Sequence, residues 1–233
     1  MQREFSEDHP ELMDLPGQDE HALREDLKSL AWINRTFGGR RAVERVFRRL
    51  ANGSRRLVLV DLCAGYGDHG RNLLDVAKER RQDVNIVAVD FQFQTLKIAR
   101  EATPAAEKMF FVQADARQLP FRTKAVDLAF CSLALHHFAE PDAVQVLKEM
   151  GRVGRFGTAC VDLARSRLAA IGIWFMTTFL IRDPMVRHDA RLSVRRAFTE
   201  SELRSLAGQA GWPNLRQVRF LMFQQAVLGT EGN

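Results

Sequence analysis

The fold of this chain is decided by residues 57–74, which read LVLVDLCAGYGDHGRNLL. An apolar strand pattern leads to the acidic residue Asp61, then to a glycine turn and a helix pattern. Gly65 and Gly67 permit a sharp turn and the close approach of a ligand, and the helix that follows begins with unpaired N–H groups. This order of features predicts a nucleotide-type cofactor site at the end of the first strand of an α/β sheet.

The glycine spacing alone leaves two cofactor classes open. Gly65, Gly67 and Gly70 fit the G-x-G-x-x-G pattern of a dinucleotide-binding turn, and Asp90 lies 20 residues beyond Gly70. Asp61 favours another cofactor, because a dinucleotide turn usually has an apolar strand at that point. A carboxylate there suits the α-ammonium group of S-adenosylmethionine (SAM), bound directly, through water or through the loop amides. Alternatively, Asp61 only fixes the turn through backbone N–H groups.

On these residues the chain resembles the class I SAM-dependent methyltransferases, over roughly residues 57–228. Their first motif looks like 61–67 here. The resemblance implies an α/β fold, with a Rossmann-like seven-stranded sheet and helices on both faces. It also implies that SAM is the cofactor, that S-adenosylhomocysteine is the product, and that Cys63 and Ala64 line the cofactor site with the glycines. Cys63 stands where the family usually has glycine, which narrows the floor beneath the methionine part of SAM.

The next two strands also end in carboxylates. Residues 84–90 read as a buried strand whose final Asp90 can accept hydrogen bonds from both ribose hydroxyls. The alternative for Asp90 is a helix N-cap for the stretch 92–100.

Residues 109–116 form the third expected strand and its end. By resemblance, Asp115 accepts from the adenine amino group and the Ala116 N–H faces the ring, while Phe91 covers the adenine face. An exposed loop aspartate would look the same in sequence.

A fourth strand, 125–131, leads to Ser132, His136 and His137. In the family this segment borders the methionine end of SAM and the acceptor, so we place Ser132 in the cofactor site. We expect at most one of the two neighbouring histidines to face the acceptor, and we favour His137 over His136 as the general base. His188, followed by the carboxylate Asp189, is a competing candidate.

The free energy needed to remove a proton from the acceptor narrows its chemical class. A phenol with a pKa near 10 needs about 4 to 5 kcal/mol of help at neutral pH, which one imidazole can supply. An unactivated alcohol needs roughly 12 kcal/mol and normally recruits a metal. We expect no metal site, because the sequence contains no H-x-x-x-H, C-x-x-C or carboxylate grouping with ligand spacing.

An insert, 164–192, follows the fifth expected strand, 158–163. It contains an almost uncharged run, 168–181, that is too short to span a bilayer of about 30 Å. We expect a lid helix that presents apolar side chains to an apolar or aromatic acceptor: Trp174, Phe175, Met176 and Phe179. The alternative is a helix that packs only against its own protein or a dimer partner.

The remaining segments complete the predicted fold. Residues 1–52 read as an N-terminal helical extension with helices at 19–35 and 40–51, forming a lid after a loosely ordered opening through Leu15. Thr199 opens a helix with a capping-box pattern, and two closing strands follow, 215–223 and 224–228.

A bacterial subgroup of these enzymes, often associated with polyketide or phenolic-lipid biosynthesis, also resembles this chain. The resemblance rests on five short segments: 10–14, 33–35, 38–39, 188–189 and 193–198. It is the reason that we name a phenolic acceptor first.

Composition indicates a single domain of 233 residues. The net charge is +5, but the basic residues are interleaved with acids at helical spacing, which makes a nucleic-acid partner an unfavoured prediction. Three unpaired cysteines and the lack of an apolar signal region favour the cytoplasm, with no membrane span, as a monomer or homodimer.

The sequence therefore predicts a SAM-dependent methyltransferase, with O-methylation of a small apolar or phenolic acceptor favoured. The alternatives are a tRNA or rRNA methyltransferase, a C-methyltransferase of a quinone or polyketide, an NAD(P)-dependent oxidoreductase, and a catalytically silent SAM-binding partner.

Overall fold

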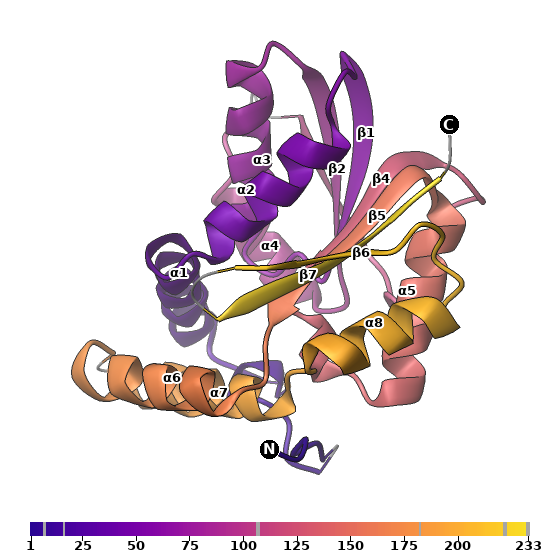
Figure 1. Ribbon diagram of the computed structural model, residues 1–233. Helices are drawn as coiled ribbons and strands as arrows, with labels where there is room; N and C mark the ends of the chain where they lie inside the picture. The colour runs from indigo at the N-terminus through magenta and orange to yellow at the C-terminus, as the bar shows by residue number, and fades with distance from the viewer. Residues whose placement is uncertain (7, 16, 106–107, 182, 221–222, 232–233) are drawn as a thin grey trace.

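The computed structural model describes residues 1–233 apart from 7, 16, 106–107, 182, 221–222 and 232–233. Its centre is a seven-stranded sheet in the order β3-β2-β1-β4-β5-β7-β6 (Figure 1). The strands are β1 (Arg56–Leu62), β2 (Asp83–Asp90), β3 (Met109–Gln113), β4 (Val126–Ser132), β5 (Gly154–Leu163), β6 (Arg216–Arg219) and β7 (Gln224–Thr230).

The five strands from β3 to β5 run parallel, and β7 runs antiparallel to both β5 and β6. Leu62 pairs with Val89 on one side and with Cys131 on the other. The carboxyl ends of β1, β2 and β4 therefore meet at one edge of the sheet. The predicted seven-stranded α/β sheet is confirmed.

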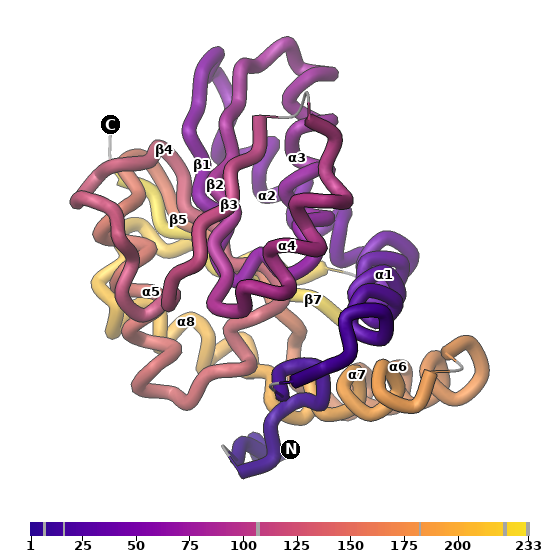
Figure 2. Tube along the Cα trace, turned by 180° about the vertical axis from the view of Figure 1, so that it is seen from behind, coloured from indigo at the N-terminus to yellow at the C-terminus, as the bar shows by residue number. Residues whose placement is uncertain are grey.

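Helices cover both faces of this sheet and its carboxyl edge. They are η1 (Leu12–Asp14), α1 (Glu20–Thr36), α2 (Gly39–Leu50), α3 (Asp68–Glu79), α4 (Phe93–Glu101), η2 (Leu135–His137), α5 (Glu140–Val153), α6 (Arg167–Phe179), α7 (Pro184–Arg196) and α8 (Glu200–Gln209). Helices α2 and α3 pack on one face, and α5 and α8 on the other. Helices α1, α6 and α7 lie beyond the carboxyl ends of the strands (Figures 1 and 2).

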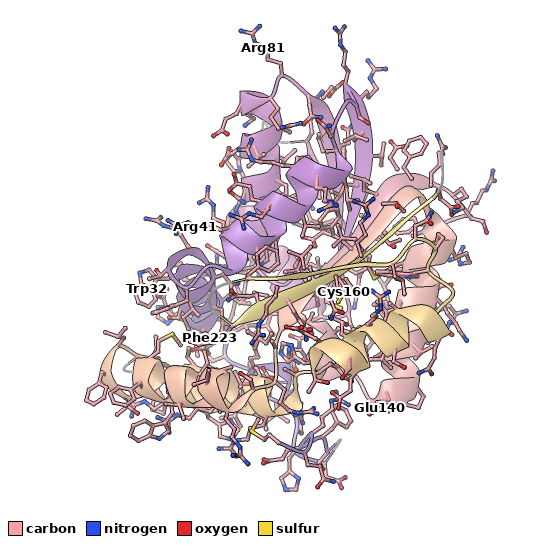
Figure 3. The ribbon with its side chains drawn as sticks, viewed as in Figure 1. Trp32, Arg41, Arg81, Glu140, Cys160 and Phe223 are labelled. Carbon is pink, nitrogen blue, oxygen red and sulfur yellow. The ribbon has the colours of Figure 1, made fainter. Side chains whose placement is uncertain are left out.

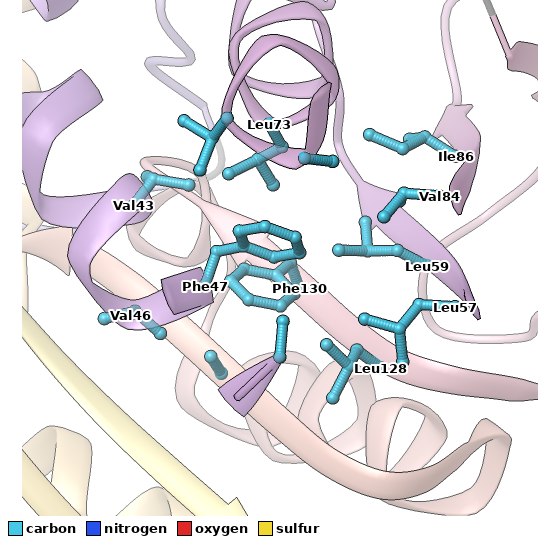
Figure 4. Close-up of a cluster of buried hydrophobic side chains, with 14 of the residues drawn as sticks. Val43, Val46, Phe47, Leu57, Leu59, Leu73, Val84, Ile86, Leu128 and Phe130 are labelled. Carbon is cyan, nitrogen blue, oxygen red and sulfur yellow. The ribbon is translucent and has the colours of Figure 1, made fainter. Parts of the chain in front are cut away.

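The core follows the alternation of side chains along β1. Leu57 and Leu59 face α2 and α3, whereas Val60 and Leu62 face α5 and α8. On the first face, the rings of Phe47 and Phe130 lie 6.5 Å apart and are fully buried (Figure 4). Both faces of β1 are thus buried, which explains its near-continuous apolar sequence.

The C-terminal part of the chain keeps the predicted order of elements. Thr199 caps α8 and exchanges hydrogen bonds with Glu202, so the predicted capping box is confirmed. The insert after β5 forms the two helices α6 and α7, which pack against each other. Within the residues described, none of the helices combines the length and the hydropathy of a membrane-spanning segment.

The opening segment is more ordered than the sequence predicts. Glu11 is 3% exposed, and the N–H groups of Leu12 and Met13 donate to the carboxylate of Asp189 on α7. The guanidinium of Arg3 donates to carbonyl oxygens close to η2 and at the end of α7. These partners are more than a hundred residues away in sequence, so no local pattern predicts them.

Replacing the central aromatic pair should test this packing. We expect Phe130→Ala to lower the free energy of unfolding by about 3–5 kcal/mol, because it leaves a cavity in a fully buried cluster. The matched control is Phe110→Ala on β3, whose side chain is 56% exposed and should change stability by about 0.5 kcal/mol or less. Urea unfolding measures both, and equal effects would contradict the assigned core.

Candidate cofactor and acceptor site

A cavity of about 590 Å³ lies at the carboxyl edge of the sheet. One part of its wall comes from the loop after β1 and from the ends of β2, β3 and β4. The other part comes from the opening segment and from α1, α6 and α7. Its size is within the usual range for small-ligand sites, and its position is where α/β sheets usually bind ligands.

The loop after β1 has the left-handed backbone that its glycines permit. The φ angles are +53° at Cys63, +52° at Gly65 and +71° at Gly67. Gly67 precedes α3 and does not line the cavity, whereas Cys63, Ala64 and Gly65 do. Cys63 adopts a conformation that disfavours a side chain by about 1–2 kcal/mol, which agrees with the glycine that the family usually has there.

Asp90 holds this loop in place. One carboxylate oxygen accepts from the Gly65 N–H at 2.9 Å, and the other accepts from the Gln92 N–H at 3.0 Å. The side chain lines the cavity, and burial raises its pKa. Gln92, not Asp90, is the N-cap residue of α4. The predicted contact of Asp90 with ribose stays a prediction.

Asp61 lies beneath the loop and does not line the cavity. Its side chain is 2% exposed, and among the described residues its Oδ2 atom has no hydrogen-bond partner. Burial, together with the charges of Asp68 and Asp90, raises its pKa to about 8. Within the described residues, Oδ2 of this buried carboxyl group is therefore left unpaired. The predicted contact of Asp61 with the ammonium group of SAM stays a prediction.

Two other buried polar side chains at the cavity lack partners within the described part of the chain: the hydroxyl of Ser132 and both ring nitrogens of His69. His69 lies in the first turn of α3. Sequence reasoning missed it, because a single histidine carries no spacing signal. These unpaired groups, with Asp61, show that the residues present fit a polar ligand such as SAM.

Asp115, just after the end of β3, already forms an ion pair with Arg117. Asp115 and Ala116 line the cavity beside Phe91, which is 71% exposed. Hydrogen bonds from Arg117, at distances down to 2.7 Å, lower the pKa of the Asp115 carboxyl group. Arg117 also bridges to Asp142 at 2.9 Å. The predicted contacts of Asp115, Ala116 and Phe91 with adenine stay predictions.

Both neighbouring histidines line the cavity. Nδ1 of His136 lies 2.6 Å from the buried Asp162, and Nδ1 of His137 lies 2.7 Å from Asp14. The two rings are 4.5 Å apart. Sequence reasoning did not foresee that both rings would line the cavity, where the short helix η2 places them side by side. Which of them faces the acceptor stays a prediction.

The buried Glu11 completes this group. Its Oε1 lies 3.7 Å from Nε2 of His136, and its Oε2 lies 3.7 Å from Nε2 of His137. The Ser193 hydroxyl donates to Oε1 at 2.7 Å. The Glu11, His136 and His137 ligand atoms lie within 4.8 Å of one another, close enough to hold a metal ion. The sequence predicted no such cluster, since Glu11 is far from the histidines along the chain.

His137 is held between two carboxylates. Burial lowers its pKa, but the charges of Glu11 and Asp14 outweigh burial and raise it to about 10. In this state the ring carries a proton at pH 7, whereas a general base must be free to take one. The role of His137 as the base therefore stays a prediction.

His188 does not line the cavity. Its side chain is 54% exposed, and its Nδ1 lies 2.9 Å from Asp189. Asp189 is occupied by the backbone of the opening segment. The structure therefore gives Asp189 a role in positioning that segment, and it places the candidate base His188 outside the site.

The second wall of the cavity is apolar. Ile33 of α1 faces it together with Ile173 and Met176 of α6. Gly172 lets the Phe223 ring pack directly on α6, because a Cβ there would lie 2.4 Å from the ring (Figure 3). This contact fixes the face that α6 turns to the cavity.

The predicted aromatic lining of the insert is only partly correct. Met176 lines the cavity, but Trp174, Phe175 and Phe179 are 49%, 56% and 69% exposed on the outward face of α6. The apolar run has no polar stripe that would reveal which face points inward.

The strand order, the antiparallel β7 and the glycine loop under a cavity are those of the class I SAM-dependent methyltransferases. Residues 59–157 match the family described as "Methyltransferase domain", so this part of the chain is similar to methyltransferase domains.

Curated methyltransferases are similar to this chain in sequence. The demethylmenaquinone methyltransferase of Bacillus licheniformis is 31% identical over 124 residues, 53% of this chain and 51% of that protein. The enzyme of the same name from Staphylococcus aureus is 30% identical over 108 residues, 46% of this chain and 43% of that protein. The chain thus spans about half the length of the curated relatives it matches.

Solved structures share the fold. Human N-acetylserotonin methyltransferase in complex with SAM superposes with a TM-score of 0.67 at 15% identity, covering 92% of this chain and 57% of that one. A SAM-dependent methyltransferase from Aquifex aeolicus has a TM-score of 0.62 at 17% identity, covering 88% and 97%.

The raised pKa of Asp61 predicts proton release when SAM binds. At about pH 6.5 the Asp61 carboxyl group, with its pKa of about 8, is mostly protonated. A bound ammonium group favours the charged form, so nearly one proton should leave. Calorimetry in buffers of different ionisation enthalpy measures this release.

Asp61→Asn is the matched control for that measurement. It should bind SAM more weakly and release no proton. A binding heat of the unaltered protein that is the same in every buffer would contradict the assigned role.

Proposed function

We propose that the protein transfers a methyl group from SAM to the hydroxyl oxygen of a small, apolar aromatic acceptor of the phenol class. One observation carries the proposal: a single cavity joins the glycine loop to an apolar wall and to the polar cluster of Glu11, His136 and His137. The cofactor and the acceptor would share this space, as in-line transfer requires.

The charge of the cavity supports a cationic cofactor. Its described lining contains one arginine and no lysine but six carboxylates: Glu11, Asp14, Asp68, Asp90, Asp115 and Asp142. SAM, a sulfonium cation with an ammonium group, supplies an electrophilic methyl group. The pyrophosphate of a nicotinamide cofactor and the phosphates of RNA would both be repelled. The same observation therefore counts against the oxidoreductase and the tRNA or rRNA methyltransferase.

The apolar wall supports an aromatic acceptor. A ring bound between Ile33 of α1 and the inward residues Ile173 and Met176 would be shielded from water. Its hydroxyl group would then reach the polar cluster, which is the polar end of this part of the cavity. The chain orients the acceptor oxygen and excludes water. The new bond forms between that oxygen and the methyl carbon while the carbon–sulfur bond of SAM breaks and S-adenosylhomocysteine leaves, and the hydroxyl proton is lost to the polar cluster or to solvent.

A second candidate is methylation of a ring carbon in a quinol. The similarity to proteins named demethylmenaquinone methyltransferase favours it. Both candidates need a hydroxylated aromatic ring in the same place, and they differ only in which ring atom faces the methyl group.

Product analysis tests the proposal. We expect the protein with SAM to methylate members of a panel of phenols and reduced naphthoquinones, for example 2-naphthol and menadiol, and mass spectrometry of the products distinguishes O- from C-methylation. Total bacterial RNA serves as the competing acceptor. Methylation of RNA with none of the aromatic panel would overturn the assignment.

The two faces of α6 give a matched pair of variants. Met176→Gln places an amide in the apolar wall and should raise the KM for the aromatic acceptor about tenfold or more, with the Kd for SAM unchanged. Phe179→Gln lies on the outward face of the same helix, where the side chain is 69% exposed, and should leave both constants unchanged. Equal effects of the two substitutions would place the acceptor elsewhere.

A further inference from the structure

We propose that Glu11, His136 and His137 form a site for one divalent transition-metal ion at the acceptor end of the cavity, with Zn²⁺ as the ion that the ligand set suits best. Two imidazoles and one carboxylate that leave a coordination position open are typical of catalytic zinc sites. The ion itself depends only on these side chains. Its use in the reaction rests on the function proposed above.

The distances between these side chains are closer to those between metal ligands than to those of hydrogen bonds. Each Nε2 atom lies 3.7 Å from a different oxygen of Glu11, beyond the range of about 2.7–3.2 Å for a hydrogen bond. Zinc bonds of about 2.0–2.2 Å at tetrahedral angles place ligand atoms about 3.3–3.6 Å apart. Small rotations of the three side chains would therefore place the three atoms around one ion.

The second nitrogen of each ring is fixed as in known metal sites. Nδ1 of His136 is hydrogen-bonded to Asp162, and Nδ1 of His137 is hydrogen-bonded to Asp14. Since a carboxylate accepts, Nδ1 donates, and Nε2 is the ring nitrogen left for a metal, which would displace the second proton of the His137 ring. Carboxylate partners on the non-coordinating nitrogen orient the ring and strengthen it as a ligand.

The carboxylates of the cluster favour the binding of a cation. Three carboxylates surround the two imidazoles: those of Glu11, Asp14 and Asp162. Glu11 and Asp162 are 3% and 1% exposed, so water compensates little of their charge. A divalent ion between the rings and Glu11 offsets this charge without moving the backbone.

The site is open on the side where a substrate would bind. Glu11, His136 and His137 all line the cavity that also contains the glycine loop. An ion held by these three residues would have its remaining coordination position toward that space. There it would bind the acceptor oxygen and lower the pKa of the hydroxyl group, which would give up its proton to solvent. The oxygen would then form the bond to the methyl carbon as the carbon–sulfur bond of SAM breaks.

Metal binding can be tested without any methyl transfer. The metal-free protein is titrated with Co²⁺, whose visible absorption reports its ligands, and with Zn²⁺ against a chromogenic chelator. We expect one equivalent per chain for the unaltered protein. Glu11→Gln and His137→Gln should each weaken binding at least tenfold, and Asp162→Asn should weaken it by about 10–100-fold through His136.

Two controls accompany this titration. His21→Gln removes an exposed histidine of α1 and should leave metal affinity unchanged. SAM binding and thermal unfolding of each variant show that it is folded, so a missing metal site is distinguished from a failed fold or a failed cofactor assignment. Equal Co²⁺ binding by the unaltered protein, Glu11→Gln and His137→Gln, or no binding by the unaltered protein, would overturn the proposal.

Discussion

The alignment of strand ends is the constraint on which the rest of the structure depends. Because Leu62 pairs with both Val89 and Cys131, the carboxyl ends of β1, β2 and β4 meet at one edge. The hydrogen bond from the Gly65 N–H to Asp90 then fixes the glycine loop against the neighbouring strand. A shift of one residue in this pairing would separate the loop from its carboxylate and turn each buried side chain to the opposite face.

The features that were predictable from sequence are local ones. Apolar runs predicted the strands, and a glycine turn followed by a helix pattern predicted the cofactor loop, because each signal lies within a few neighbouring residues. The capping box at Thr199 is another such signal. Asp61, Asp90 and Asp115 were located at strand ends for the same reason, although their contacts depend on groups that only the folded chain brings close.

The part of the cavity that we propose for the acceptor was less predictable, because segments far apart in the sequence build it. Glu11 and Asp14 meet His136 and His137 only after the opening segment packs against α7 and η2. The orientation of α6 depends on Phe223 packing at Gly172, which the uniformly apolar helix sequence does not specify. The sequence also showed no sign of an electrostatic contrast. The chain carries a net charge of +5, yet the charged side chains in the described lining of the cavity are mostly acidic, with six carboxylates and one arginine.

Because the opening segment is attached to Asp189, two separate parts of the chain build the cavity. The central sheet carries the glycine loop and its carboxylates, whereas residues 11–14, α6 and α7 supply much of the wall on the other side. Substitutions in these peripheral segments can reshape the acceptor space while the strands and their register stay as they are. Such substitutions could therefore change, in the course of evolution, which molecules the cavity binds, while the sheet and its glycine loop stay the same.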